Sequence, residues 1–192
     1  MLWMRYSVLL LILILPVAAV VMVAGSFGVG ATLENRDSFC ASCHTQPEST
    51  YVQRAAAAAP VDLASYHTAK ATRCIDCHSS SGEGGRFQAE LNGASNALRF
   101  FTRTDVQPGR LPGPYGDDGC LKCHADVVNQ PINGNNHYHE YLARWQATSP
   151  SAGGCVSCHP AHTTDSAADN LFMTDAVTQE VCAACHQVLT ER

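Results

Sequence analysis

The sequence Cys40-Ala41-Ser42-Cys43-His44 is one of five Cys-x-x-Cys-His motifs in a chain of 192 residues. The others occupy residues 74–78, 120–124, 155–159 and 182–186. Together they contain all ten cysteines and five of the nine histidines. This pattern is typical of c-type haem attachment, in which two thiols bond to the haem vinyl groups and the following imidazole binds the iron.

Other uses of the cysteines explain the pattern less well. Four-cysteine zinc sites need CxxC pairs two at a time, and five pairs leave one over. A disulfide framework would not need the histidines, and a thioredoxin-like motif normally occurs once, near a βαβ pattern. We therefore predict five covalently bound haem c cofactors. The attachment sites are Cys40, Cys43, Cys74, Cys77, Cys120, Cys123, Cys155, Cys158, Cys182 and Cys185. The proximal iron ligands are His44, His78, His124, His159 and His186.

Composition limits the fold class. A chain of this size that holds five haems has little polypeptide left to build an apolar core of its own. We predict a multihaem cytochrome c fold, with mainly short α-helices and coil wrapped around five haems, one N-terminal transmembrane helix, and little or no sheet. The net charge of −5 and the presence of only two lysines, Lys70 and Lys122, argue against nucleic-acid binding, which needs a basic face.

The N-terminal stretch predicts a membrane anchor. No residue from Tyr6 to Leu33 is charged. A membrane-spanning helix needs about 20 apolar residues, whereas a signal-peptide core has about 7–15. We therefore predict that residues 1–33 form an uncleaved single-pass anchor, with cleavage around residues 24–31 as the alternative. Arg5 precedes the stretch and Glu34 follows it, which favours a cytoplasmic N-terminus. The haem motifs would then lie on the periplasmic side of a bacterial inner membrane.

The rest of the chain divides at a segment rich in Pro and Gly. Residues 105–119 predict a linker between a two-haem region, 34–104, and a three-haem region, 120–192. The alanine-rich stretch 51–59 predicts a helix that Pro60 ends.

Two further stretches carry apolar residues at helical spacing. The first should pack on a haem face or lie on the membrane surface, the haem face being the plainer reading. Its apolar residues are Phe87, Leu91, Ala94, Leu98 and Phe101. The second should pack on haem through Tyr138, Tyr141, Leu142 and Trp145.

The supply of axial ligands is one short. Four histidines lie outside the motifs, so five irons cannot all have a second histidine. His67, seven residues before Cys74, is well placed for one of the first two haems. His137 and His139 lie two residues apart, and both could bind, to different haems. The predicted distal ligands are His67, His137, His139 and His162, with Met173 either a thioether ligand or a core side chain.

The first half resembles the small membrane-anchored quinol dehydrogenases of the NapC/NirT/NrfH type. The likeness covers residues 1–105, and its motifs are Phe39–His44 outside the anchor, His67 ahead of Cys74–His78, Leu91-Asn92-Gly93 and Phe100-Phe101. The resemblance implies a first haem at the membrane that takes electrons from quinol. That family usually has a methionine two residues after the first motif histidine, where this chain has Gln46.

The second half resembles the pentahaem electron carriers of nitrite reduction and the doubled CxxCH modules. The likeness lies in residues 155–162, in Leu171-Phe172 and in residues 182–186. It implies that His162 ligates a neighbouring haem iron, as does one histidine of the His137–His139 pair.

These patterns predict an electron-transfer protein with no catalytic residue of its own. It would carry electrons from the quinol pool or a membrane partner complex to a periplasmic reductase, soluble cytochrome or reaction centre. Two alternatives stay open: a haem enzyme that reduces a small nitrogen or oxyanion substrate at an open iron, and a haem-bearing subunit of a larger respiratory or photosynthetic complex. If the protein is an enzyme in its own right, quinol oxidation is the expected activity. Glu34, Asp37, Glu48 and Lys70 are then candidate proton acceptors.

Overall fold

The structure, a computed structural model, describes residues 2–79, 81–105, 115–129, 137–148, 153–174, 179–183 and 186. Within these ranges the chain forms helices and coil and no strand, which confirms the prediction of a mainly helical fold with little sheet. The elements are α1 (Leu2–Glu34), α2 (Asp37–Cys40), α3 (Glu48–Ala55), α4 (Leu63–Thr68), α5 (Cys74–Cys77), α6 (Gly82–Phe101), α7 (Asp118–His124), η1 (Ala125–Asn129), α8 (His137–Thr148), α9 (Cys155–Cys158) and η2 (Ala168–Asn170).

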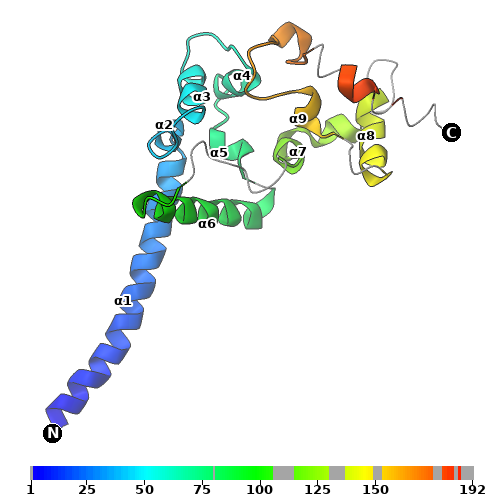
Figure 1. Cartoon of the computed structure of the whole chain (residues 1–192). Coiled ribbons are helices and arrows are strands. Elements are labelled where there is room, and N and C mark those ends of the chain that lie inside the picture. Colours follow the sequence, from blue (N-terminus) through cyan, green and yellow to red (C-terminus); the bar gives the residue numbers. More distant parts are fainter. Residues whose placement is uncertain are drawn as a thin grey trace.

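Helix α1 projects away from the rest of the molecule (Figure 1). Its segment Leu10–Glu34 is long and apolar enough to cross a membrane, as the sequence predicted. Most of the apolar side chains described there are exposed; Leu13 and Val20, for example, are both 67% exposed. A contiguous apolar surface of this kind on a water-soluble protein would be an aggregation hazard.

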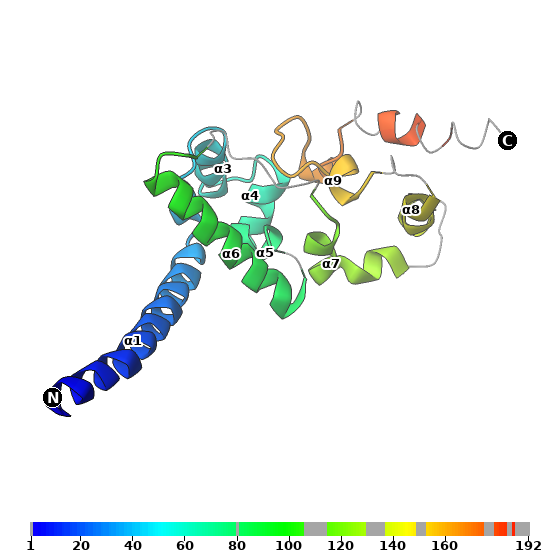
Figure 2. The same ribbon diagram turned by 60° about the horizontal axis from the view of Figure 1, so that its bottom comes forward.

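Helix α6 crosses the end of α1 nearest the haem motifs, on the underside of the domain (Figures 1 and 2). The rings of Phe27 and Phe87 lie 6.2 Å apart at this crossing. An ion pair also joins the two helices, with Arg86 Nη2 3.2 Å from the Glu34 carboxylate. The predicted helix over Phe87–Phe101 is therefore confirmed and begins earlier, at Gly82.

The alanine-rich helix differs from its prediction at both ends. Helix α3 begins at Glu48 and ends at Ala55, before the alanine run is complete. The Ala55 carbonyl oxygen accepts a hydrogen bond from Thr68 Oγ1 at 3.2 Å, so it serves a contact with α4. Tertiary contact here outweighs the helix propensity of residues 56–59.

The fold does not rest on an apolar protein core. Phe172, 5% exposed, is the one buried hydrophobic side chain among the described residues. The accessible surface of the chain is 13747 Å², against about 8,900 Å² expected for a compact protein of this mass. Other interactions must therefore hold the helices in place.

One such interaction is a polar cluster that joins α3, α4 and the segment after α9. Asp62 is 1% exposed and caps α4 by accepting from the Ser65 backbone N–H at 2.7 Å. Arg54 lies 3.5 Å from the Asp62 carboxylate and donates to the His162 carbonyl oxygen at 3.0 Å. The Ala64 N–H also donates to the Ala161 carbonyl oxygen at 2.9 Å. Residues from the predicted two-haem and three-haem regions thus contact each other directly. Residues 106–114 of the predicted linker lie outside the described residues, and the boundary stays a prediction.

Replacing Asp62 with alanine should destabilise the protein. The change removes the α4 cap and leaves the partly buried Arg54 without its carboxylate, with an expected cost of about 2–4 kcal/mol in the free energy of unfolding. Urea titration of the holoprotein followed by far-ultraviolet circular dichroism would measure the loss. The exposed Asp165 provides a matched Asp165→Ala control, which should stay within about 0.5 kcal/mol of wild type. Equal losses in the two variants would contradict this role for the cluster.

Candidate haem-binding site

The second and fourth motifs each form a single helical turn, whereas the first begins at the last residue of α2 and the third ends α7. Helix α5 spans Cys74–Cys77 and α9 spans Cys155–Cys158, and each is followed by its histidine. The backbone N–H groups of His78 and His159 donate to the first cysteine of their motifs at 2.9 Å. Residues three apart on such a turn are neighbours on one face. Both thiols of a motif therefore face the same side, as attachment to one haem requires.

Three of the four histidines outside the motifs lie beside a motif histidine. The ring centroids of His67 and His124 are 6.1 Å apart, with the ring planes at 90°. Those of His78 and His162 are 6.2 Å apart at 16°. Those of His139 and His159 are 6.3 Å apart at 19°.

These separations fit two imidazoles on opposite sides of one haem iron. An iron–nitrogen bond of about 2 Å and just over 1 Å from nitrogen to ring centre, taken twice, give centroids about 6.3 Å apart. Direct face-to-face stacking would bring the rings closer, as in the Tyr51–His162 contact at 4.1 Å. Ligation leaves the rotation of each ring about the iron axis open, so both near-parallel and perpendicular pairs are compatible. The donor set therefore fits haem iron.

Backbone carbonyls orient two of these rings. His67 Nδ1 lies 2.9 Å from the Leu63 carbonyl oxygen, and His159 Nδ1 lies 2.8 Å from that of Leu171. An Nδ1–H donor in each bond leaves the Nε2 lone pair free, which is the usual arrangement around a metal-binding histidine. Leu171 and Phe172 both adopt left-handed backbone, with φ of 52° and 59°. Such conformations are strained for large residues; here they aim the Leu171 carbonyl at His159 and the Phe172 ring at the buried interior.

The electrostatics favour the neutral imidazole, the form that binds a metal. Burial lowers the pKa of His78. Burial and then the neighbouring His78 lower the pKa of His162. Burial and then His159 lower the pKa of His139. Histidines of lowered pKa are therefore present in two of the three pairs.

The remaining predicted ligands are not brought into such pairs. His137 is in contact with Tyr138, at a centroid distance of 5.3 Å. His44 lies beside Glu48, whose Oε1 is 4.0 Å from Nδ1. Met173 donates its backbone N–H to Asn170, and no contact of its sulfur with a motif histidine is found among the described residues. His186 is described, but Cys185 of its motif lies outside the described residues.

Successive motifs are neighbours in space. Burial, Asp37 and then the Cys40 sulfur raise the pKa of the Cys74 thiol to about 12. Burial and then Cys120 raise the pKa of Cys77, and a hydrogen bond with Cys120 raises that of Cys155. Burial and then Cys182 raise the pKa of the Cys158 thiol. In Figure 1, α5 lies between α2, next to α1, and the two helices α7 and α9, which lie one above the other.

An aspartate three residues before the first cysteine links motifs in pairs. Asp37 Oδ1 accepts from the Cys74 backbone N–H at 2.9 Å, so the first motif is tied to the second. Asp117 Oδ1 accepts from the Cys155 N–H at 2.6 Å, which ties the third motif to the fourth. Gly154 permits the second link, since a Cβ there would collide with the Asp117 carboxylate. Sequence reasoning missed this repeat, although its signal, an aspartate at the same offset before Cys40 and Cys120, is visible in the chain.

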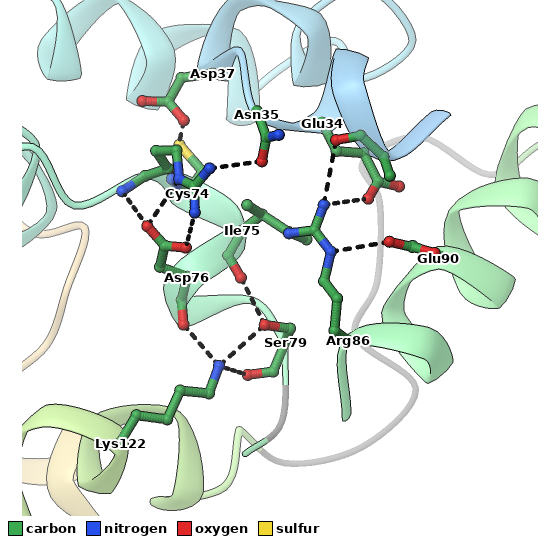
Figure 3. A network of polar contacts seen from close by, with 12 residues as sticks. Glu34, Asn35, Asp37, Cys74, Ile75, Asp76, Ser79, Arg86, Glu90 and Lys122 are labelled. Carbon is green, nitrogen blue, oxygen red and sulfur yellow. Dashed lines mark hydrogen bonds and ion pairs between the residues drawn. The ribbon is translucent and has the colours of Figure 1, made fainter. Parts of the chain in front are cut away.

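A polar cleft of about 690 Å³ lies between α1, α5, α6 and α7. Figure 3 shows the contacts that line it. Arg73 binds the Asp76 carboxylate through Nη2 at 2.7 Å, and Lys122 Nζ donates to the Asp76 carbonyl oxygen at 2.7 Å. Arg86 bridges Glu34 and Glu90 at 3.2 and 3.1 Å. These contacts join the third motif to the second, and α6 to the end of α1.

The contacts also place the four candidate proton acceptors. Glu34 pairs with Arg86, Asp37 binds the Cys74 N–H, Glu48 lies beside His44, and Lys70 lies over the Tyr66 ring at 4.3 Å. None of these contacts tests a role in proton transfer.

Comparison with known proteins supports the haem assignment at the C-terminal end. Residues 149–191 match the family described as the doubled CXXCH motif. No curated protein and no solved structure matches the chain. The CXXCH motifs indicate covalently bound haem c, and the matched family supports a multihaem cytochrome c involved in electron transfer.

The Asp117 link should affect stability. Asp117→Ala removes a charge-assisted bond to Cys155 N–H and a second bond from Gln146 Nε2 at 2.8 Å. The expected loss is about 2–3 kcal/mol in the free energy of unfolding, measured by urea titration. Asp117→Asn keeps an oxygen acceptor and should lose about half as much. If the two variants behave alike, or neither differs from wild type, the carboxylate is not what joins these motifs.

Proposed function

We propose that this protein is a membrane-anchored pentahaem c-type cytochrome that carries electrons from the quinol pool or a membrane partner complex to a periplasmic acceptor. In this proposal α1 is the anchor and each of the five motifs carries one haem. His67 and His124, His78 and His162, and His139 and His159 are axial pairs. The observation that carries the proposal is the set of three histidine pairs at separations that fit iron ligation.

The pairs favour electron transfer over chemistry on a substrate. Haem iron would supply a one-electron redox couple, and the two imidazoles of each pair would hold the iron and leave no open position for a substrate. The chain's part is to hold those imidazoles in place, through Leu63 and Leu171 carbonyls and through the Arg54–Asp62 cluster behind His162. A site fixed in this way changes little between oxidation states.

The motifs form a row that has one end at the membrane and the other end far from it. The first motif follows directly on α1, and the fifth, containing Cys182, lies at the opposite side of the domain (Figures 1 and 2). Cysteines of successive motifs lie close to one another, as in the contact of Cys120 with Cys155. Donor and acceptor are therefore expected at opposite ends of the row, with the donor at the membrane end.

The axial pairs can be tested on α8, which carries two histidines. Residues two apart on a helix point to nearly opposite sides, and His139, not His137, is paired with a motif histidine. His139→Ala should therefore open one iron, visible as a new high-spin signal in electron paramagnetic resonance and as added carbon monoxide binding of one haem equivalent. His137→Ala, the matched control, should add neither.

The outcomes separate the alternatives. The same new high-spin signal in both variants, or in neither, would contradict the His139–His159 pair. Carbon monoxide binding by the reduced wild-type protein should involve at most the first and fifth haems, whose histidines lack a histidine partner among the described residues. Binding at three or more haems would contradict the three axial pairs.

The donor can be tested with the full-length holoprotein in lipid vesicles. Addition of a reduced menaquinone analogue should reduce the haems promptly, followed at the haem absorbance band, with vesicles lacking quinol as the control. If dithionite reduces every haem and quinol reduces none, direct oxidation of quinol is excluded. The electrons must then come from a protein partner in the membrane.

A further inference from the structure

Helix α6 carries one continuous apolar face. Phe100, 38% exposed, lies on another side of the helix, but at 100° per residue five other apolar side chains fall within an arc of about 80°. They are Phe87, Leu91, Ala94, Leu98 and Phe101, and all are exposed. Leu98 and Phe101 are the most open, at 66% and 80%. Gln88, Asn92, Asn96 and Arg99 lie on the opposite arc. A helix with this division has one side made for an apolar surface and one for water.

The apolar face looks toward the same side as the apolar segment of α1. Phe87, at the centre of the face, meets Phe27 of α1 with ring centroids 6.2 Å apart. About 20 residues of helix cross a bilayer core of about 30 Å. Arg5 is the last charged residue before Glu34, and a helix of this length that starts after Arg5 ends close to Phe27. The crossing of α1 and α6 therefore lies where the core would meet the headgroups.

A different row of α6 faces the haem motifs. Gly82, Arg86 and Glu90 line the polar cleft, opposite Arg73 and Lys122 of the second and third motifs. The apolar row is turned away from this side by roughly a quarter turn. Figure 2, which turns the underside of the molecule forward, shows α6 on that underside with α5 behind it and α7 to one side.

We propose that α6 is an interfacial helix that lies on the outer surface of the membrane crossed by α1, with its apolar face among the upper acyl chains. The apolar face of α6 meets the apolar segment of α1 at Phe27, so the surface that covers this face should be the same lipid that surrounds α1. Arg99 and Arg103 at the C-terminal end of α6 suit anionic headgroups. The inference rests on the proposed anchoring by α1. Together the two helices fix the height and the tilt of the haem domain over the bilayer, which one helix alone could not do.

Lipid photo-crosslinking of the full-length holoprotein tests this placement. The vesicles would contain phosphatidylethanolamine, phosphatidylglycerol and a phosphatidylcholine with a diazirine near the glycerol end of its acyl chain. Mass spectrometry should find adducts on Leu91, Leu98 and Phe101, besides those on α1, and none on Asn92 or Asn96. Adducts on α1 alone would overturn the inference and leave the anchor standing. Adducts on neither helix would overturn the anchoring itself, and equal labelling of Asn92 and Leu91 would overturn the orientation.

A pair of double variants provides the matched control. Leu98→Glu with Phe101→Glu should abolish the adducts on α6 while leaving those on α1. Asn92→Glu with Asn96→Glu adds the same charge to the opposite arc and should leave both sets unchanged. Retention of α6 adducts in the first variant would contradict the proposed contact. The haem absorbance spectrum reports whether each variant assembles. If a variant does not assemble, the set of crosslinked residues in the wild-type protein alone tests the proposed contact.

Discussion

Three pairs of imidazoles, with ring centroids 6.1 to 6.3 Å apart, connect segments of this chain that no apolar core joins. His162, three residues after the fourth motif histidine, faces His78 of the second motif. His67, just before the second motif, faces His124 of the third. With a single buried hydrophobic side chain among the described residues, these pairings and a few polar clusters set the positions of the helices. In the proposed function, iron ligation by these pairs takes the part that hydrophobic packing has in most small domains.

The polar clusters act as supports for the pairs. Asp62 caps the short helix that carries His67, and Arg54 ties that cap to the backbone of His162. Asp37 and Asp117 use the same offset to fasten one motif turn to the next. Three of these contacts end on a predicted haem ligand or attachment cysteine, and the Asp62 cap ends on Ser65, two residues before His67. A chain with so little core keeps its buried polar groups where an imidazole or a thiol needs a fixed position.

The sequence alone predicted features that depend on local pattern. Motif spacing placed the attachment cysteines and their histidines, and apolar spacing placed α1 and α6. Which histidine lies beside which motif histidine depends on tertiary structure, so the sequence predicted these pairs less well. The position of His67 pointed to one of the first two haems, whereas the structure places its ring beside His124 of the third motif. The choice between His137 and His139 depends on the rotation of α8 about its axis, which no spacing rule gives. The Asp37 and Asp117 links escaped notice because each joins residues nearly forty positions apart.

The separation in sequence of the paired histidines bears on how the chain can be divided. His78 and His162 are 84 positions apart (162 − 78), and His67 and His124 are 57 apart (124 − 67). Closing loops of this length costs conformational entropy before any contact is gained, so high contact order is expected to make assembly slow. Neither half contains both members of these two pairs. Halves expressed separately would each have unpaired imidazoles, so the two regions are expected to fold as one cooperative unit.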